Sequence, residues 1–107
     1  MVDAAVVSAV KRYLASLPRY GIHASRAILY GSFARGAEHE WSDIDLVVVA
    51  PEFDEAHDMS TVEQLWIATE AADDRIEPIP CGEREWADDD SRPILAIARR
   101  DGIEIAA

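Results

Sequence analysis

Cysteine is nearly absent from the sequence, and long apolar runs are absent altogether. The single cysteine, Cys81, excludes an internal disulfide and any site built from several thiolates, which favours an intracellular protein. No apolar run approaches the roughly 20 residues of a membrane span, and residues 1–4 lack the basic start of a signal peptide. We therefore expect a cytoplasmic protein that makes no contact with a membrane.

Basic residues are also scarce. The 107 residues include 10 Lys and Arg against 21 Asp and Glu, which gives a formal net charge of −11 at pH 7. A surface with this excess of negative charge repels a phosphate backbone, so we expect no direct binding of nucleic acid. Small phosphate ligands whose charge is neutralised by a metal ion remain compatible with this negative net charge. Half of the residues are apolar and 29% are charged, a balance typical of one soluble globular domain over residues 1–107.

The hydrophobic periodicity predicts alternating helices and strands. Helical spacing continues from Ser60 to Ala72, where the predicted buried face includes Trp66. Pro78 and Pro80 indicate that the third strand lies at an edge or ends its pairing early. The predicted helices are 3–17, 60–72 and 93–101, and the predicted strands are 26–30, 43–50, 75–81 and 103–106. Together they predict an α/β (α+β) domain, a small mixed β-sheet with helices packed on it.

A Gly-Ser pair, Gly31 and Ser32, stands between the first predicted strand and a short helical segment over 32–36. Glycine has no Cβ atom, and the start of a helix presents unpaired N–H groups, so backbone donors and a hydroxyl can approach phosphate oxygens closely. The pair therefore predicts a phosphate-binding turn.

Two carboxylates, Asp43 and Asp45, begin the second predicted strand. Residues two apart on a strand point to the same side, with Cα atoms about 6.5–7 Å apart. Their mutual repulsion favours a bound cation, and Mg²⁺ prefers carboxylate oxygens together with substrate phosphates. Glu77 supplies a third acid if its strand pairs beside the second one. Three acids facing a phosphate-binding turn are typical of two-metal phosphoryl or nucleotidyl transfer, in which the ions lie roughly 3.5–4 Å apart.

The motif over residues 31–45 resembles a known signature. It reads Gly-Ser, ten further residues, then Asp-Ile-Asp, with Ala-Arg-Gly at 34–36. This pattern resembles that of the minimal nucleotidyltransferases of the DNA polymerase beta superfamily, in particular the MNT-domain antitoxins that pair with HEPN-domain toxins. The resemblance extends to the leading helix, the third acid and the closing segment over 99–103, and it implies a polymerase-beta-like nucleotidyltransferase fold.

The resemblance implies a role for each residue of the motif. The Gly31-Ser32 pair would hold the triphosphate of ATP, and Arg35 would offset phosphate charge. Asp43 and Asp45 would bind two Mg²⁺ ions, with Glu77 in the place of the third acid, where the family often has aspartate. The implied reaction is transfer of AMP to a protein hydroxyl with release of pyrophosphate. In the MNT systems that hydroxyl is a tyrosine of the HEPN toxin, which implies a hetero-oligomer and an antitoxin role.

Two other functions stay open. A catalytically inactive module could neutralise its partner by occlusion alone. A small-molecule nucleotidyltransferase that modifies an antibiotic is also compatible with the motif, but such enzymes usually carry an additional helical domain that the sequence lacks. The three tryptophans, Trp41, Trp66 and Trp86, are expected to serve core or partner-facing packing, because no basic residues surround them as in a base-stacking surface.

Overall fold

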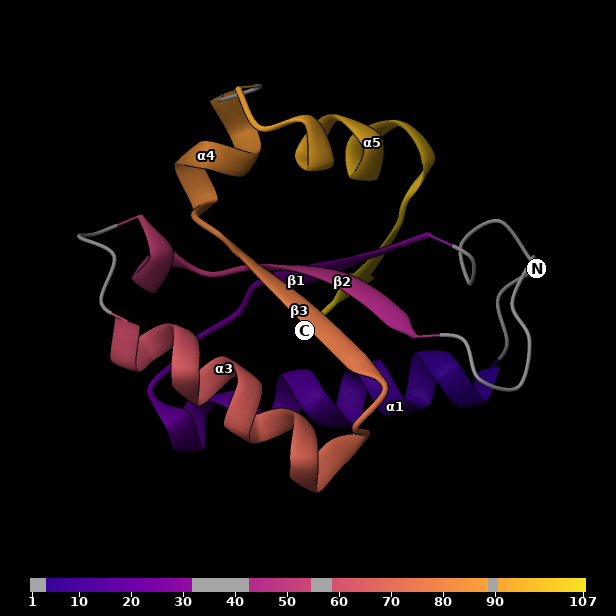
Figure 1. The fold of residues 1–107 in the computed structure, drawn as a ribbon, viewed down its shortest axis with the longest axis vertical. Helices are drawn as coiled ribbons and strands as arrows, with labels where there is room; N and C mark the ends of the chain where they lie inside the picture. The colour runs from indigo at the N-terminus through magenta and orange to yellow at the C-terminus, as the bar shows by residue number, and fades with distance from the viewer. Residues whose placement is uncertain (1–3, 32–42, 55–58, 89–90) are drawn as a thin grey trace.

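The computed structural model describes residues 4–31, 43–54, 59–88 and 91–107, which form a central β-sheet with helices on both faces (Figure 1). The helices are α1 (Ala4–Ser16), α3 (Met59–Ala72), α4 (Glu83–Asp88) and α5 (Pro93–Asp101), with 3-10 turns η1 (Leu17–Tyr20) and η2 (Pro51–Phe53). The strands are β1 (Arg26–Tyr30), β2 (Ile44–Val49), β3 (Ile76–Cys81) and β4 (Ile103–Ala106). None of the described helices is long and apolar enough to cross a membrane.

The sheet is mixed and has the order β3-β2-β1-β4. Strand β1 is antiparallel to both β2 and β4, whereas β2 and β3 are parallel. A parallel pair needs a crossover connection. Helix α3, which lies between β2 and β3 in the sequence, supplies it by running back across one face of the sheet. The predicted fold class, a small mixed sheet with packed helices, is therefore confirmed.

Two layers of helices cover the two faces of the sheet. Figure 1 shows α1 and α3 on one face and α4 and α5 on the other. Because side chains alternate along a strand, each strand supplies both cores. Ile44, Leu46 and Val48 of β2 pack towards α1 and α3, while Val47 and Val49 pack with residues of α5.

The free edge of β3 carries two prolines. Strand β3 pairs with β2 along its whole length, so Pro78 and Pro80 mark an edge without ending the pairing. Ile44 donates its N–H to the carbonyl of Arg75, and Ala50 donates to Cys81, so the odd-numbered residues of β3 bond to β2. The two prolines occupy alternate positions, where an N–H would point away from β2. The outer edge of β3 therefore lacks these two donors.

Most predicted elements appear within a residue or two of their expected bounds. Helix α4 was not predicted, and Pro18 lies in the first turn of η1, which follows the end of α1 at Ser16. The predicted helical segment over 32–36 lies outside the described residues. Trp66 does not lie on the predicted buried face of its helix: it is 46% exposed, which leaves the partner-facing role expected for it, and Ala68 is buried on that helix.

Candidate active site

A row of polar side chains crosses three strands at one end of the sheet. The register places Tyr30 of β1 opposite Asp45 of β2, and Asp45 beside Glu77 of β3. All three belong to the alternating set of positions that faces the α4–α5 layer. The next residues of that set, Val47 and Ile79, belong to the apolar cluster with α5. Tyr30 belongs to this cluster as well, whereas Asp45 is half-buried and Glu77 is exposed, so the two acids lie at the margin of the apolar cluster.

Asp43 brings a fourth polar side chain to the same place. It precedes β2 by one residue and lies two positions before Asp45, which puts both carboxylates on the same side of the strand. Asp43 and Glu77 are exposed, whereas Asp45 is half-buried. Three acids from β2, the residue before it and the parallel neighbour β3 therefore gather at one end of the sheet, and we call Asp43, Asp45 and Glu77 the acidic group.

The electrostatics confirm that these carboxylates are close together. Partial desolvation, followed by the negative charges of Asp43 and Asp45 and by hydrogen bonding of the protonated form to both, raises the pKa of Glu77. Burial, with smaller contributions from the charges of Asp45 and Glu77, raises the pKa of Tyr30 to about 12. The acidic group therefore carries mutual repulsion, which a cation would relieve.

Gly31 lies against the acidic group. Its φ angle is +76°, in the left-handed region that residues with a side chain rarely adopt. A Cβ atom at this position would also overlap the Oδ2 atom of Asp45. Glycine is therefore required twice here, once by the turn that ends β1 and once by the carboxylate beside it.

The donors of the acidic group have the chemistry that Mg²⁺ prefers, because all are carboxylate oxygens. In the described part of the chain, however, no group of three or more Asp, Glu, His or Cys side chains forms a ready set of metal ligands. The residues therefore supply the oxygen donors that a hard divalent cation prefers. In this conformation, however, their side chains are not arranged around a common metal position.

The structure brings together four of the six predicted site residues: Gly31, Asp43, Asp45 and Glu77. Ser32 and Arg35 lie outside the described residues. Tyr30 was not predicted, because its place in the row depends on the pairing of β1 with β2, and the sequence alone does not give that register.

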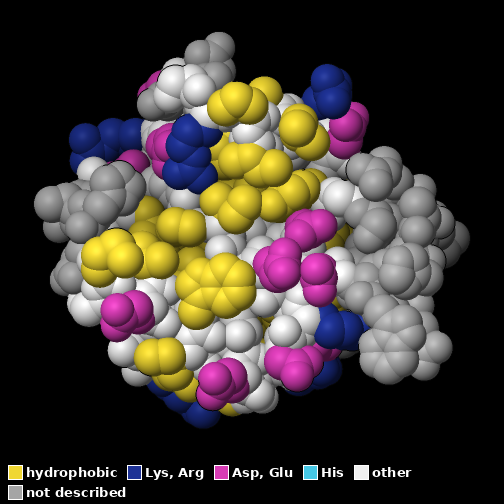
Figure 2. Space-filling view, in the orientation of Figure 1, with side chains coloured by type: hydrophobic (Ala, Val, Ile, Leu, Met, Phe, Trp, Pro, Cys, Tyr) yellow, Lys and Arg dark blue, Asp and Glu magenta, His cyan; other side chains and the backbone are white. Residues whose placement is uncertain are grey.

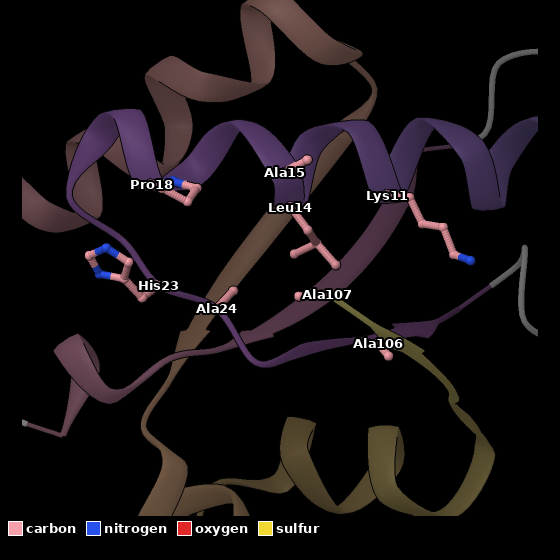
Figure 3. Close-up of a pocket in the computed structure, with 8 residues that line it drawn as sticks. All are labelled: Lys11, Leu14, Ala15, Pro18, His23, Ala24, Ala106 and Ala107. Carbon is pink, nitrogen blue, oxygen red and sulfur yellow. The ribbon is translucent and has the colours of Figure 1, made fainter.

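A separate hollow of about 520 Å³ lies between α1 and the end of β4 (Figure 3). Its lining is mainly apolar, with Lys11 and His23 as the titratable side chains, and none of its lining side chains carries a carboxylate. This hollow lacks the donors that a magnesium–phosphate complex needs, so the acidic group is the better candidate for chemistry.

A mixed sheet that presents acidic residues from neighbouring strands beside a glycine turn is the arrangement expected of a nucleotidyl-transferring enzyme. In agreement, residues 7–92 match the family described as nucleotidyltransferase domain. The chain belongs to this family, and nucleotidyl transfer is its activity. No curated protein matches the chain significantly. Helix α5 and strand β4 lie beyond the matched residues, yet β4 completes the sheet beside β1.

Proposed function

We propose that the protein transfers AMP from ATP, with Mg²⁺, to a hydroxyl of a partner protein, a tyrosine of a HEPN-domain toxin, and thereby acts as an antitoxin. The observation that carries the proposal is the acidic group beside Gly31. It combines carboxylates that can hold cations with a turn that allows phosphates to approach closely.

Asp43, Asp45 and Glu77 would hold the magnesium ions. Bound there, Mg²⁺ would neutralise phosphate charge and favour the ionised form of the attacking hydroxyl. Gly31 leaves room for the Asp45 carboxylate at the end of β1, and Ser32 and Arg35 would bind the triphosphate. The new bond joins the acceptor oxygen to the α-phosphorus. The bond from that phosphorus to the β-phosphate oxygen breaks, pyrophosphate leaves, and the hydroxyl proton passes to solvent.

A protein acceptor is supported by the shape of the domain. The described residues form one sheet with its helices. Asp43 and Glu77 of the acidic group are exposed, so a protruding side chain of another protein can reach them. The net charge of −11 also favours a partner with a basic surface.

Radiolabelled ATP tests the proposal directly. Purified protein, Mg²⁺ and lysate of the native host are incubated with ATP labelled at the α- or the γ-phosphate. We expect the α label, and not the γ label, on one protein band. The Asp43→Asn/Asp45→Asn variant should lose this label. An Asp74→Asn/Asp88→Asn variant, which removes the same charge from two exposed positions elsewhere, should keep it.

The alternative of occlusion predicts a different result. A binding module would retain an unlabelled partner in both the native protein and the Asp43→Asn/Asp45→Asn variant. That outcome would reject AMP transfer and leave the acids with a structural role.

A further inference from the structure

Helix α3 presents an outward face that combines apolar and acidic side chains. The face consists of positions spaced by three, four or seven residues, which lie on one side of a helix. We call it the α3 face, and it comprises Met59, Glu63, Trp66, Ile67 and Glu70. All five residues are exposed. The exposed fractions are 69% for Met59, 46% for Trp66 and 47% for Ile67.

The core does not need these side chains. Helix α3 buries Leu65, Ala68 and Thr69 on its inner side, and the Tyr13 hydroxyl of α1 donates to the carbonyl of Leu65 at 2.6 Å. The helix is therefore anchored independently of its outer face. A tryptophan and two further large apolar side chains on one exposed face are typical of a contact surface, where tryptophan contributes much of the binding energy.

The free edge of the sheet next to α3 limits how a partner can bind. Pro78 and Pro80 remove two outward N–H groups from β3, so a partner strand cannot pair there in the usual way. Docking on this side of the molecule therefore depends on side-chain contacts, which the α3 face offers.

The charge of the α3 face defines the chemistry of its partner. Helix α3 contains no Lys or Arg, and Glu63 and Glu70 flank Trp66 and Ile67. A second copy of the chain packed through the same face would bring these glutamates against each other, between two chains that each carry a charge of −11. A partner with apolar side chains flanked by Lys or Arg would instead pack against the apolar side chains of the face and form ion pairs with its glutamates.

Helix α3 leads into the strand that carries one member of the acidic group. Helix α3 ends at Ala72, and the chain then enters β3, where Glu77 is the second residue. Figure 2 shows hydrophobic side chains over α3 and β3 and a group of acidic side chains beside them on the same face of the molecule. Glu77 itself faces the α4–α5 side of the sheet, so a partner on the α3 face would have to extend past the edge strand β3 to reach it.

We infer that the α3 face is the docking surface for a partner protein that presents an amphipathic helix with an apolar stripe flanked by Lys or Arg. This inference rests on the proposed function only in taking that partner to be the acceptor. The binding itself is tested without any transfer of AMP.

The probe is a synthetic amphipathic peptide of about 18 residues, or five helical turns, with leucines along one side and lysines beside them. A second peptide has the same composition in an order that gives no apolar stripe, and a third replaces the lysines with glutamates. Binding is measured by titration calorimetry at physiological salt, where weak surface attraction is screened. We expect the first peptide to bind at least about tenfold more tightly than either of the others.

Variants of the chain locate the binding surface. Trp66→Ala should weaken binding of the amphipathic peptide by about tenfold or more, as for a central tryptophan of an interface. Glu63→Gln/Glu70→Gln should weaken it and reduce its dependence on salt. Ile97→Ala is the matched control, because Ile97 is 40% exposed but lies on α5, on the other side of the sheet. This control should bind within about twofold of the native protein.

Three results would overturn the inference. They are equal binding of the amphipathic and reordered peptides, equal effects of Trp66→Ala and Ile97→Ala, and a dimer of the chain alone that Trp66→Ala dissociates.

The Asp43→Asn/Asp45→Asn variant separates the two proposals. Peptide binding by this variant with no label transfer by the native protein would reject the proposed function alone, whereas label transfer without peptide binding would reject the α3 face alone.

Discussion

The Asp45 carboxylate occupies the space that a Cβ atom on residue 31 would need, so the turn after β1 and the acid on β2 fit together only when residue 31 is glycine. The contact links the two halves of the motif in space, although 13 residues separate them along the chain. It also explains in physical terms why a glycine precedes the serine of the phosphate-binding turn.

Replacing Gly31 with alanine should therefore harm both stability and activity. The change forces a side chain into a left-handed conformation with φ of +76° and pushes Asp45 out of the acidic group. We expect the free energy of unfolding to fall by about 1–3 kcal/mol, measured by denaturant titration. Nucleotidyl transfer should be lost at the same time.

Gly21 provides the matched control for this variant. Its φ angle is +80°, but no atom lies within 4 Å of the position its Cβ would take. Gly21→Ala should cost about 1–2 kcal/mol of backbone strain and leave the transfer rate unchanged. Equal loss of activity in the two alanine variants would contradict a specific role for the contact between Gly31 and Asp45.

Removing one charge from the acidic group should change how the protein responds to magnesium. If Mg²⁺ binds the folded state alone, a concentration of about 100 times its dissociation constant stabilises the native protein by about 2.7 kcal/mol. Asp45→Asn should lose most of this gain. In EDTA the variant should be at least as stable as the native protein, because repulsion with Glu77 is reduced. Thermal unfolding with Mg²⁺ and with EDTA measures both effects, with Asp74→Asn as the control. An unchanged response to Mg²⁺ in Asp45→Asn would place the metal elsewhere.

Much of the fold could be predicted from local pattern. The strand around Val47 and the helix around Val10 have apolar periods that match their burial, and these elements appear as expected. Helix α4 escaped prediction because it has six residues, none of them buried, so its sequence carries no apolar period. Its position depends instead on distant contacts, such as those that Asp54 makes with its first N–H groups.

The candidate site was predicted in part for the same reason. The spacing of Asp43 and Asp45 along one strand is a local property, and so is the turn at Gly31. The pairing of Asp45 with Glu77 and with Tyr30 depends on strand register, which no local pattern specifies. Trp66 was assigned to the wrong face because a tryptophan within an apolar helical period is usually buried, and here the outer surface of α3 is also apolar.

Acid should weaken the junction between α3 and β3 through Asp73. The Arg75 side chain donates to this carboxylate through Nε at 3.1 Å and Nη2 at 2.8 Å, and these bonds lower the pKa of Asp73. A carboxyl with a lowered pKa in the folded state contributes stability above its ordinary pKa, and this stability is lost as the pH falls through the folded value. Asp73→Asn should therefore cost about 1 kcal/mol at pH 7 and progressively less towards acid pH.

The control for Asp73 is an ion pair that is more open to solvent. Arg26 and Glu104 lie 2.9 Å apart, but their side chains are 40% and 56% exposed. Glu104→Gln should change the free energy of unfolding by less than about 0.5 kcal/mol. Urea titrations from neutral to acid pH compare the two variants with the native protein. A cost of Asp73→Asn that grows as the pH falls would contradict the assignment of the lowered pKa.

Asp54 should control the stability of α4 from outside that helix. Its carboxylate accepts hydrogen bonds from the backbone N–H of Glu83 at 2.9 Å and of Arg84 at 3.1 Å, so it acts as an N-terminal cap from a distant part of the chain. Asp54→Ala should lower the free energy of unfolding by about 1–2 kcal/mol and speed amide exchange in α4. Glu52→Ala is the control, because Glu52 bonds to His23 and not to α4. Strand β3 leads directly into α4, so amide exchange in β1 and β4 is the better measure of the rest of the domain. If exchange rises there as much as in α4, Asp54 stabilises the whole domain and not this one helix.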